Sequence, residues 1–267
     1  MKVNKIYNED CLDTMARMPD CFVDLTVTSP PYDNLRTYTG EMQWNEGVWK
    51  AVIKFLYRVT KQGGVVVWIV GDATIKGSET LTSFKQAIHA KDVGFNLHDT
   101  MIWNKNGFSA VGALKTRYSP VFEYMFIFSK SKPKTFNPIK DKPNKNAGKL
   151  ISKTKRLANG ETKKGKSYIS SDFGQRYNIW KQCPHRQRGC GKHPAPFPKQ
   201  LIHDHIISWS NLEDLVYDPF MGSGTTAKMA ILNKRNYIGS EISKEYCGIA
   251  KKRINELPLL ARTTMKK

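Results

Sequence analysis

Two short motifs in this 267-residue chain carry residue types that could act together chemically. The first is Ser29-Pro30-Pro31-Tyr32, which follows the apolar, β-branched run at residues 23–27. Its two prolines fix the backbone after the predicted strand, so the Ser29 hydroxyl and the Pro30 carbonyl can form a rigid pair of acceptors. An amino group that donates to both would have its lone pair drawn out of conjugation, while Tyr32 stacks on the ring that carries it. The motif therefore favours a site that makes a ring-borne amino nitrogen nucleophilic, although an ordinary loop or a proline-recognition motif is also compatible with it.

The second motif, at residues 218–226, reads Asp-Pro-Phe-Met-Gly-Ser-Gly-Thr-Thr and lies between a predicted strand and a predicted helix. Its glycines let the backbone approach a ligand, and the N–H groups that open the helix can donate to a carboxylate. Glu241 ends the next predicted strand, 17 residues beyond Gly224, where its side chain can accept hydrogen bonds from ribose hydroxyls. The motif lacks the third glycine of the dinucleotide fingerprint and the Gly-Lys-Ser/Thr of a phosphate loop. It therefore predicts a nucleotide-like cofactor other than a hydride carrier or ATP, with a ligand-free turn as the alternative.

Both motifs have to be positioned by a sheet, and the hydrophobic pattern predicts one. The run at residues 65–70 is apolar throughout, as strands buried on both faces of a parallel sheet are. Strands and helices alternate along the chain, which predicts one α/β domain. Strands are predicted at 23–27, 65–70, 98–104, 122–129, 214–218 and 237–241, and helices at 49–60, 80–90, 198–207, 225–233 and 245–257.

A basic segment interrupts this alternating pattern. Residues 130–192 contain 18 Lys and Arg against 3 Asp and Glu, so 15 of the 20 net positive charges of the chain lie there. Such a surplus predicts a polyanionic partner, either nucleic acid or an anionic membrane surface, with a merely solvated surface as the alternative. We therefore predict a basic insertion at 131–192 that divides the α/β domain into halves at 1–130 and 193–267.

The cysteines and the apolar runs limit the class of protein further. Five cysteines, an odd and scattered number, argue against a secreted disulfide framework. No run has the length of a signal peptide's apolar region or of a membrane span, so we predict a cytoplasmic protein without a membrane partner. The group Cys183, His185, Cys190 and His193 is spaced more tightly than the usual zinc finger, and we predict no metal.

Residues 28–32 resemble the catalytic motif of amino-methylating DNA methyltransferases, and residues 218–226 resemble the motif with which those enzymes bind S-adenosylmethionine. The order of catalytic motif, basic region and cofactor motif is similar to that of the β group of this family, in which the basic region recognises the target. The resemblance covers roughly residues 4–130 and 193–257. It implies a three-layer, Rossmann-like methyltransferase fold with a mostly parallel seven-stranded sheet, one strand being antiparallel, and a basic target-recognition insertion. It also implies S-adenosyl-L-methionine as cofactor and double-stranded DNA as substrate, with the target base flipped out of the helix.

The same resemblance assigns roles to individual residues. It places Asp10 beside the cofactor adenine and Phe197 in a segment on the methionine side of the pocket. The residues with implied catalytic roles are Ser29, Pro30, Pro31 and Tyr32. The residues with implied cofactor contacts are Asp10, Phe197, Asp218, Phe220, Gly222, Ser223, Gly224, Thr225 and Glu241.

The target base follows less directly from the sequence. In the family that the motifs resemble, serine at the first catalytic position usually accompanies cytosine N4 and aspartate accompanies adenine N6, so Ser29 favours N4. Methylation of cytosine C5 is disfavoured because it needs a cysteine nucleophile, and the chain has no Pro-Cys dipeptide to place one. Adenine N6, a protein amide nitrogen and a binding module with a vestigial fold stay open. A cognate restriction endonuclease is a candidate partner, and the chain is expected to be a monomer or a homodimer.

Overall fold

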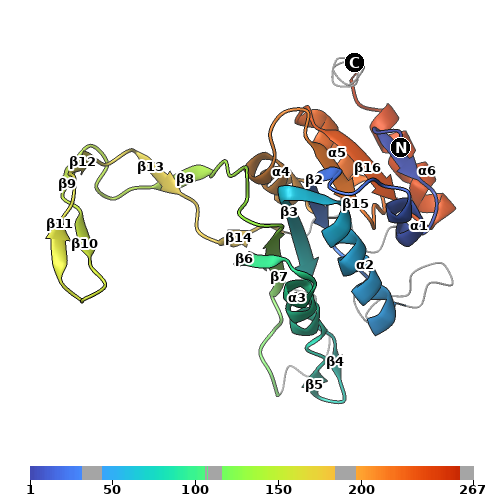
Figure 1. The fold of residues 1–267 in the computed structure, drawn as a ribbon, viewed down its shortest axis with the longest axis horizontal. Coiled ribbons are helices and arrows are strands. Elements are labelled where there is room, and N and C mark those ends of the chain that lie inside the picture. Colours follow the sequence, from blue (N-terminus) through green and yellow to red (C-terminus); the bar gives the residue numbers. More distant parts are fainter. Residues whose placement is uncertain (32–43, 106, 108–115, 184–196, 259–267) are drawn as a thin grey trace. The chain divides into compact units, whose positions relative to one another are not determined.

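The computed structural model describes residues 1–31, 44–105, 107, 116–183 and 197–258. The chain divides into two compact units, of which the second, Pro138–Asn178, interrupts the first, Met1–Asn137 with Ile179–Lys267 (Figure 1). No helix within the described ranges is long and apolar enough to cross a membrane.

The first unit is built on one large sheet with the strand order β1-β16-β15-β2-β3-β7-β6-β14 (Figure 1). β7 runs antiparallel to both of its neighbours, and the other pairings of the sheet are parallel. The predicted mostly parallel sheet with one antiparallel strand is therefore confirmed, but the described residues give it eight strands rather than seven. The strands are β1 (Lys5–Tyr7), β2 (Val23–Thr28), β3 (Thr60–Val70), β6 (Asn96–Asn104), β7 (Phe122–Ser129), β14 (Ile179–Lys181), β15 (Leu215–Asp218) and β16 (Asn236–Ser240).

The eighth strand, β14, comes from residues that we assigned to the basic insertion. It pairs in parallel with β6, and Trp103 on β6 donates its ring N–H to the carbonyl of Gln182 over 2.7 Å. The Trp180 side chain is buried and stacks on His205, with 4.5 Å between the ring centroids. A three-residue strand between polar residues shows no usable period, so the sequence pattern does not predict it.

The chain also enters the second unit from a fixed position. The Asn137 N–H donates to the carbonyl of Ser208 over 2.8 Å, and its side-chain amide donates to the carbonyl of Ile207 over 3.1 Å. Asn137 and β14, the parts of the first unit that flank the segment 138–178, are therefore both hydrogen-bonded to other elements of the first unit.

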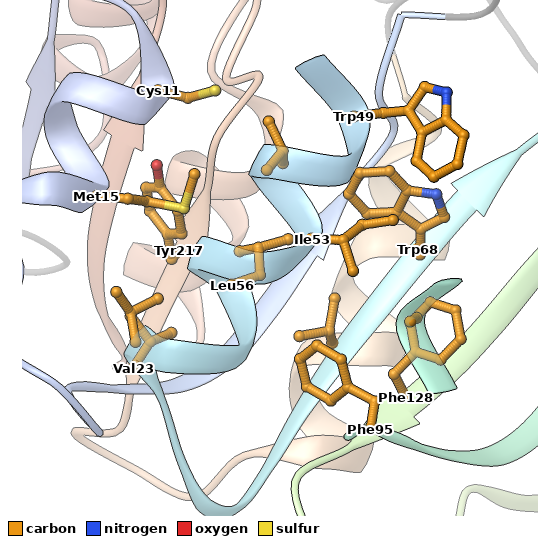
Figure 2. Close-up of a cluster of buried hydrophobic side chains, with 14 of the residues drawn as sticks. Cys11, Met15, Val23, Trp49, Ile53, Leu56, Trp68, Phe95, Phe128 and Tyr217 are labelled. Carbon is orange, nitrogen blue, oxygen red and sulfur yellow. The ribbon is translucent and has the colours of Figure 1, made fainter. Parts of the chain in front are cut away.

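Helices cover both faces of the sheet and make three layers. α1, α2 and α3 pack on one another, and α4, α5 and α6 form a second group. Figure 2 shows part of the core under the first group, to which α2 contributes Ile53 and Leu56 and the sheet contributes Trp68 and Phe128. Met125 points to the opposite face from Phe128 and lies 3.2 Å from the ring of His205 on α4. The helices are α1 (Cys11–Ala16), α2 (Glu46–Val59), α3 (Thr82–Val93), α4 (Lys199–Trp209), α5 (Thr225–Leu232) and α6 (Lys244–Asn255).

A short hairpin, β4 (Thr74–Ile75) with β5 (Ser78–Glu79), follows β3. The second unit consists of three antiparallel strand pairs that continue one another along a long hairpin. Its side chains are mostly exposed, and it contains 11 Lys and Arg against 3 Asp and Glu. The pairs are β8 (Lys140–Pro143) with β13 (Phe173–Gln175), β9 (Leu150–Ile151) with β12 (Tyr168–Ile169), and β10 (Thr154–Arg156) with β11 (Thr162–Lys164).

Candidate active site

The described candidate residues other than Phe197 lie at or just after the carboxyl ends of four neighbouring parallel strands, β1, β16, β15 and β2. Ligands of open α/β sheets bind at this edge, because the loops that follow parallel strands meet there. Asp10 follows β1, Glu241 follows β16, Asp218 ends β15 and Ser29 follows β2. The fold thus brings together segments that are more than 200 residues apart in the chain.

One hydrogen bond joins the two motifs directly. Thr28, the residue before Ser29, donates its hydroxyl to Oδ1 of Asp218 over 2.7 Å. The hydroxyl of Thr226 donates to Oδ2 over 2.7 Å, and the Phe220 N–H donates to Oδ1 over 3.0 Å. Burial raises the pKa of Asp218 to about 6, although these three donors act in the opposite direction. The catalytic motif and the glycine turn therefore begin side by side at a shared buried carboxyl group.

The glycine turn has a conformation that only glycine adopts easily. Gly222 and Gly224 have φ angles of 51° and 81°, in the left-handed region. A Cβ atom at Gly224 would lie 2.7 Å from Cβ of Ala250 on α6, so helix and turn approach without space for a side chain. Gly224 caps α5 without any side-chain hydrogen bond, which leaves the first-turn amides of that helix to a carboxylate ligand. The turn fits the methionine carboxylate of S-adenosylmethionine.

Glu241 lies beside this turn with both carboxylate oxygens engaged. Oε2 accepts the N–H of Gly222 over 2.7 Å, and Oε1 accepts the N–H of Ser243 over 2.8 Å. The pKa of Glu241 is raised because burial disfavours its charged form; the two N–H donors lower it. Each carboxylate oxygen can accept a second hydrogen bond, so the carboxylate keeps its capacity for ribose hydroxyls.

Two residues at this edge were not singled out from the sequence. The Asn8 side chain donates to the carbonyls of Glu241 and Ile242 over 2.8 and 2.9 Å and so ties the end of β1 to the cofactor side. The Trp44 ring meets the Phe220 ring edge-on, with 5.3 Å between their centroids. A polar residue directly after a strand was the available signal for Asn8, whereas a lone tryptophan in a loop offers none.

The remaining predicted residues have the following positions. Asp10 caps α1, where Oδ1 accepts the N–H of Leu12 over 2.7 Å, so part of its role is structural. Pro30 is buried, Ser29 and Pro31 are half-buried, and Phe197 is half-buried just before α4. Tyr32 lies outside the described residues, as do His185, Cys190 and His193 of the cysteine and histidine group. In the described part of the chain, no cluster of three or more His, Cys, Asp or Glu side chains could hold a metal.

A three-layer α/β fold with one antiparallel strand, and with a glycine turn and an acidic residue after adjacent strands, fits the class of S-adenosylmethionine-dependent methyltransferases. Residues 23–252 match the family model of the N6 and N4 DNA methylases, and the chain belongs to this family. It is a DNA methyltransferase that uses S-adenosylmethionine and acts on cytosine N4 or adenine N6. A protein amide acceptor and a vestigial binding module are thereby set aside.

Curated relatives and solved structures agree with this assignment. The chain is 53% identical over 249 residues to the orphan methyltransferase M.BamHII of Bacillus amyloliquefaciens, and the alignment covers 90% of this chain and 92% of that relative. It is 30% identical over 259 residues to the type II methyltransferase M.BglII of Bacillus subtilis, covering 93% and 68%.

Among solved structures, the PvuII DNA methyltransferase (cytosine-N4-specific) aligns with a TM-score of 0.71 and 21% identity, over 99% of this chain and 92% of that one. A DNA modification methylase of Thermus thermophilus, complexed with S-adenosyl-L-methionine, aligns with a TM-score of 0.62 and 23% identity, over 94% and 92%. These two likenesses show a common fold.

Proposed function

We propose that this DNA methyltransferase transfers the methyl group to the exocyclic N4 of cytosine, in a base flipped out of double-stranded DNA. The observation that carries the proposal is Ser29, which occupies the first catalytic position directly after the Thr28 link to Asp218. The PvuII structure bears the name of a cytosine-N4-specific enzyme, but at 21% identity its likeness concerns the fold. The choice of base therefore rests on Ser29.

In the proposed mechanism, the Ser29 hydroxyl and the Pro30 carbonyl accept the two N–H bonds of the target amino group. These bonds localise the lone pair on the nitrogen and aim it, while Tyr32 stacks on the base. When bound, S-adenosylmethionine would supply an electrophilic sulfonium methyl group and would keep the electron pair of the broken S–C bond as a thioether, while the methylated amino group would lose one proton to solvent. The chain contributes orientation and a preorganised electrostatic environment, without a covalent enzyme intermediate.

We assign the cofactor site to the other half of this edge. The first-turn amides of α5 bind the methionine carboxylate, and Glu241 accepts the ribose hydroxyls. Asp10 and Phe197 complete the adenine and methionine sides. Asp218 holds the glycine turn against the catalytic strand through its contacts with Thr28 and Thr226. The residues assigned to the turn itself are Phe220, Gly222, Ser223, Gly224 and Thr225.

We assign DNA recognition to the basic segment 131–192, whose centre is the second unit. Basic and aromatic side chains are interleaved there: Lys142 donates to the Tyr177 hydroxyl over 3.1 Å, and Nζ of Lys153 lies 4.7 Å from the Tyr168 ring centroid. Exposed lysines neutralise phosphates, and exposed aromatic rings can stack on bases. DNA affinity is expected to fall steeply with salt, and a salt-independent affinity would contradict this assignment. The cytoplasmic location, the monomeric or dimeric state and the restriction endonuclease partner stay predictions.

The target base can be tested with purified enzyme, double-stranded DNA and S-adenosylmethionine labelled in its methyl group. After digestion of the DNA to nucleosides, mass analysis should find the label in N4-methylcytosine. Label in N6-methyladenine would replace the proposed base while leaving the family assignment intact. A Ser29→Ala variant should lose about 100-fold in kcat with unchanged affinity for S-adenosylmethionine, because it removes one preorganised acceptor.

A further inference from the structure

Arg253 on α6 is a buried arginine at the back of the glycine turn. Its side chain is 2% exposed, and its Nη1 donates to the Ser223 carbonyl. The same nitrogen lies 2.8 Å from the Ser223 hydroxyl and 3.4 Å from the Thr225 hydroxyl, both of which can accept from it. A guanidinium is costly to bury unless its N–H groups are hydrogen-bonded, and here the bonds go to the residues on both sides of Gly224.

The packing of α6 explains how Arg253 reaches the turn. Ala250 lies three residues earlier, on the same face of the helix, and touches Gly224 where no Cβ fits. The amino end of α6 is capped by Ser243, whose own N–H donates to Glu241. α6 is therefore joined at its start to the residue proposed for the ribose and, two turns later, to the turn proposed for the carboxylate.

We propose that Arg253 is the positioning residue of the cofactor site, which fixes Ser223–Thr225 so that the amides of α5 meet the methionine carboxylate. Its positive charge behind the turn strengthens the attraction that the helix amino terminus exerts on an anion. The inference rests on the proposed placement of the cofactor at this turn. It predicts that the loss of Arg253 weakens the binding of the amino-acid part of the cofactor and leaves nucleoside binding nearly unchanged.

Two ligands separate these contributions in calorimetric titrations of the full chain. S-adenosylhomocysteine carries the carboxylate and the ribose, whereas methylthioadenosine carries the ribose and lacks the carboxylate. The Arg253→Gln variant should bind S-adenosylhomocysteine about 10- to 100-fold more weakly and methylthioadenosine within about 2-fold of wild type. Its KM for S-adenosylmethionine should rise by a similar factor, while its DNA affinity should stay within about 3-fold. Equal weakening of both ligands, or of neither, would overturn the role of Arg253.

Arg235 offers a matched control for the removal of a buried arginine. It is 7% exposed and donates to the carbonyls of Ser210 and Asn233 over 2.6 Å each. It lies at the amino end of β16, whereas the candidate site lies at the carboxyl end of that strand. Arg235→Gln should lower the melting temperature without selective loss of either ligand. A carboxylate-selective loss in that variant would show that destabilisation alone produces the effect.

Further variants keep the test decisive. Glu241→Gln should weaken both ligands, and if it weakens neither, the proposed cofactor placement itself is wrong. If Glu241→Gln weakens the binding of both ligands while Arg253→Gln weakens neither selectively, the proposed cofactor placement is supported and the proposed role of Arg253 is wrong. If circular dichroism shows that Arg253→Gln is unfolded, the role of Arg253 is tested instead with Arg253→Lys and Ser223→Ala. Each is expected to give a smaller loss that is again selective for S-adenosylhomocysteine, and no loss in either overturns the proposal.

Discussion

The hydrogen bond between Thr28 and Asp218 connects the end of β2 to the start of the glycine turn, and Thr28→Val removes it with little change of shape. Thr28 is fully buried and Asp218 is 2% exposed, so water cannot replace the lost donor. A buried hydrogen bond to a charged group contributes about 1.5–3 kcal/mol, and we expect the variant to lose this much free energy of unfolding at pH 8. For a chain of this size, in which 1 kcal/mol corresponds to about 2–4 °C, the melting temperature should fall by roughly 3–12 °C.

The pH dependence of the stability loss in Thr28→Val tests whether Asp218 is the partner of the Thr28 hydroxyl. Because Asp218 has a pKa of about 6, against 3.8 when it is unperturbed, the unfolded state loses its proton first as the pH rises. The folded state is therefore destabilised by about 3 kcal/mol between pH 3.8 and 6. Loss of the Thr28 donor raises the pKa of Asp218 further. The stability difference between wild type and Thr28→Val should consequently be smaller at pH 5, where Asp218 is protonated in both, and grow above pH 6.

Thr26 on the same strand supplies the control. Its hydroxyl is buried without a hydrogen-bond partner in the described structure, so Thr26→Val should be neutral or slightly stabilising. Stability is measured by urea unfolding at both pH values, and activity by transfer of labelled methyl groups to DNA. We expect Thr28→Val to lower kcat about tenfold, because the two motifs are no longer held in register. Equal losses in the two variants, or a loss for Thr28→Val that does not depend on pH, would refute the reasoning.

Three further outcomes are expected. Gly224→Ala should weaken S-adenosylmethionine binding at least about tenfold, because the φ angle of Gly224 and its contact with α6 both exclude a Cβ atom. Gly160→Ala is the control: Gly160 is also left-handed but has open space around it, so binding should be unchanged. Calorimetric titration compares the two variants. Asp24→Asn should lower the free energy of unfolding in urea by about 1–3 kcal/mol at pH 7, because the buried Asp24 carboxylate accepts a hydrogen bond from Lys134 over 2.5 Å. The pKa of Asp24 is lowered in the folded state, so this difference in stability should disappear as the pH falls through the folded-state pKa. Trp180→Ala should cost about 3–5 kcal/mol of stability by emptying a buried aromatic site under β14, and a melting temperature equal to that of wild type would contradict it.

The sequence predicted the elements whose residues repeat a period or end in a recognisable turn. The apolar strand at 65–70 and the glycine turn at 218–226 are of this kind, and both lie where expected. Short elements held by tertiary contacts could not be predicted: β1 has three residues, α1 has six, and β14 depends on the burial of Trp180.

The candidate site shows the same division. Ser29, Gly222 and Glu241 were found because their residue types and spacing indicate chemistry. The contacts of Asn8 and Arg253 depend on how distant segments pack; the position of Asn8 directly after a strand was a signal, whereas nothing in the local sequence signals Arg253. The link between Thr28 and Asp218 follows from the pairing of β2 with β15, which only the strand order reveals.

The fixed ends of the segment 138–178 have a consequence for how such an enzyme can change its preference. Asn137 is bonded to the end of α4, and β14 is paired with β6, so both attachment points belong to rigid elements of the first unit. The intervening hairpin can therefore vary in length and composition while the sheet and its catalytic edge keep their structure. Under the proposed assignment of DNA recognition to this segment, its exchange between relatives, with junctions at residues 137 and 179, is predicted to change the target sequence while the sheet keeps its structure.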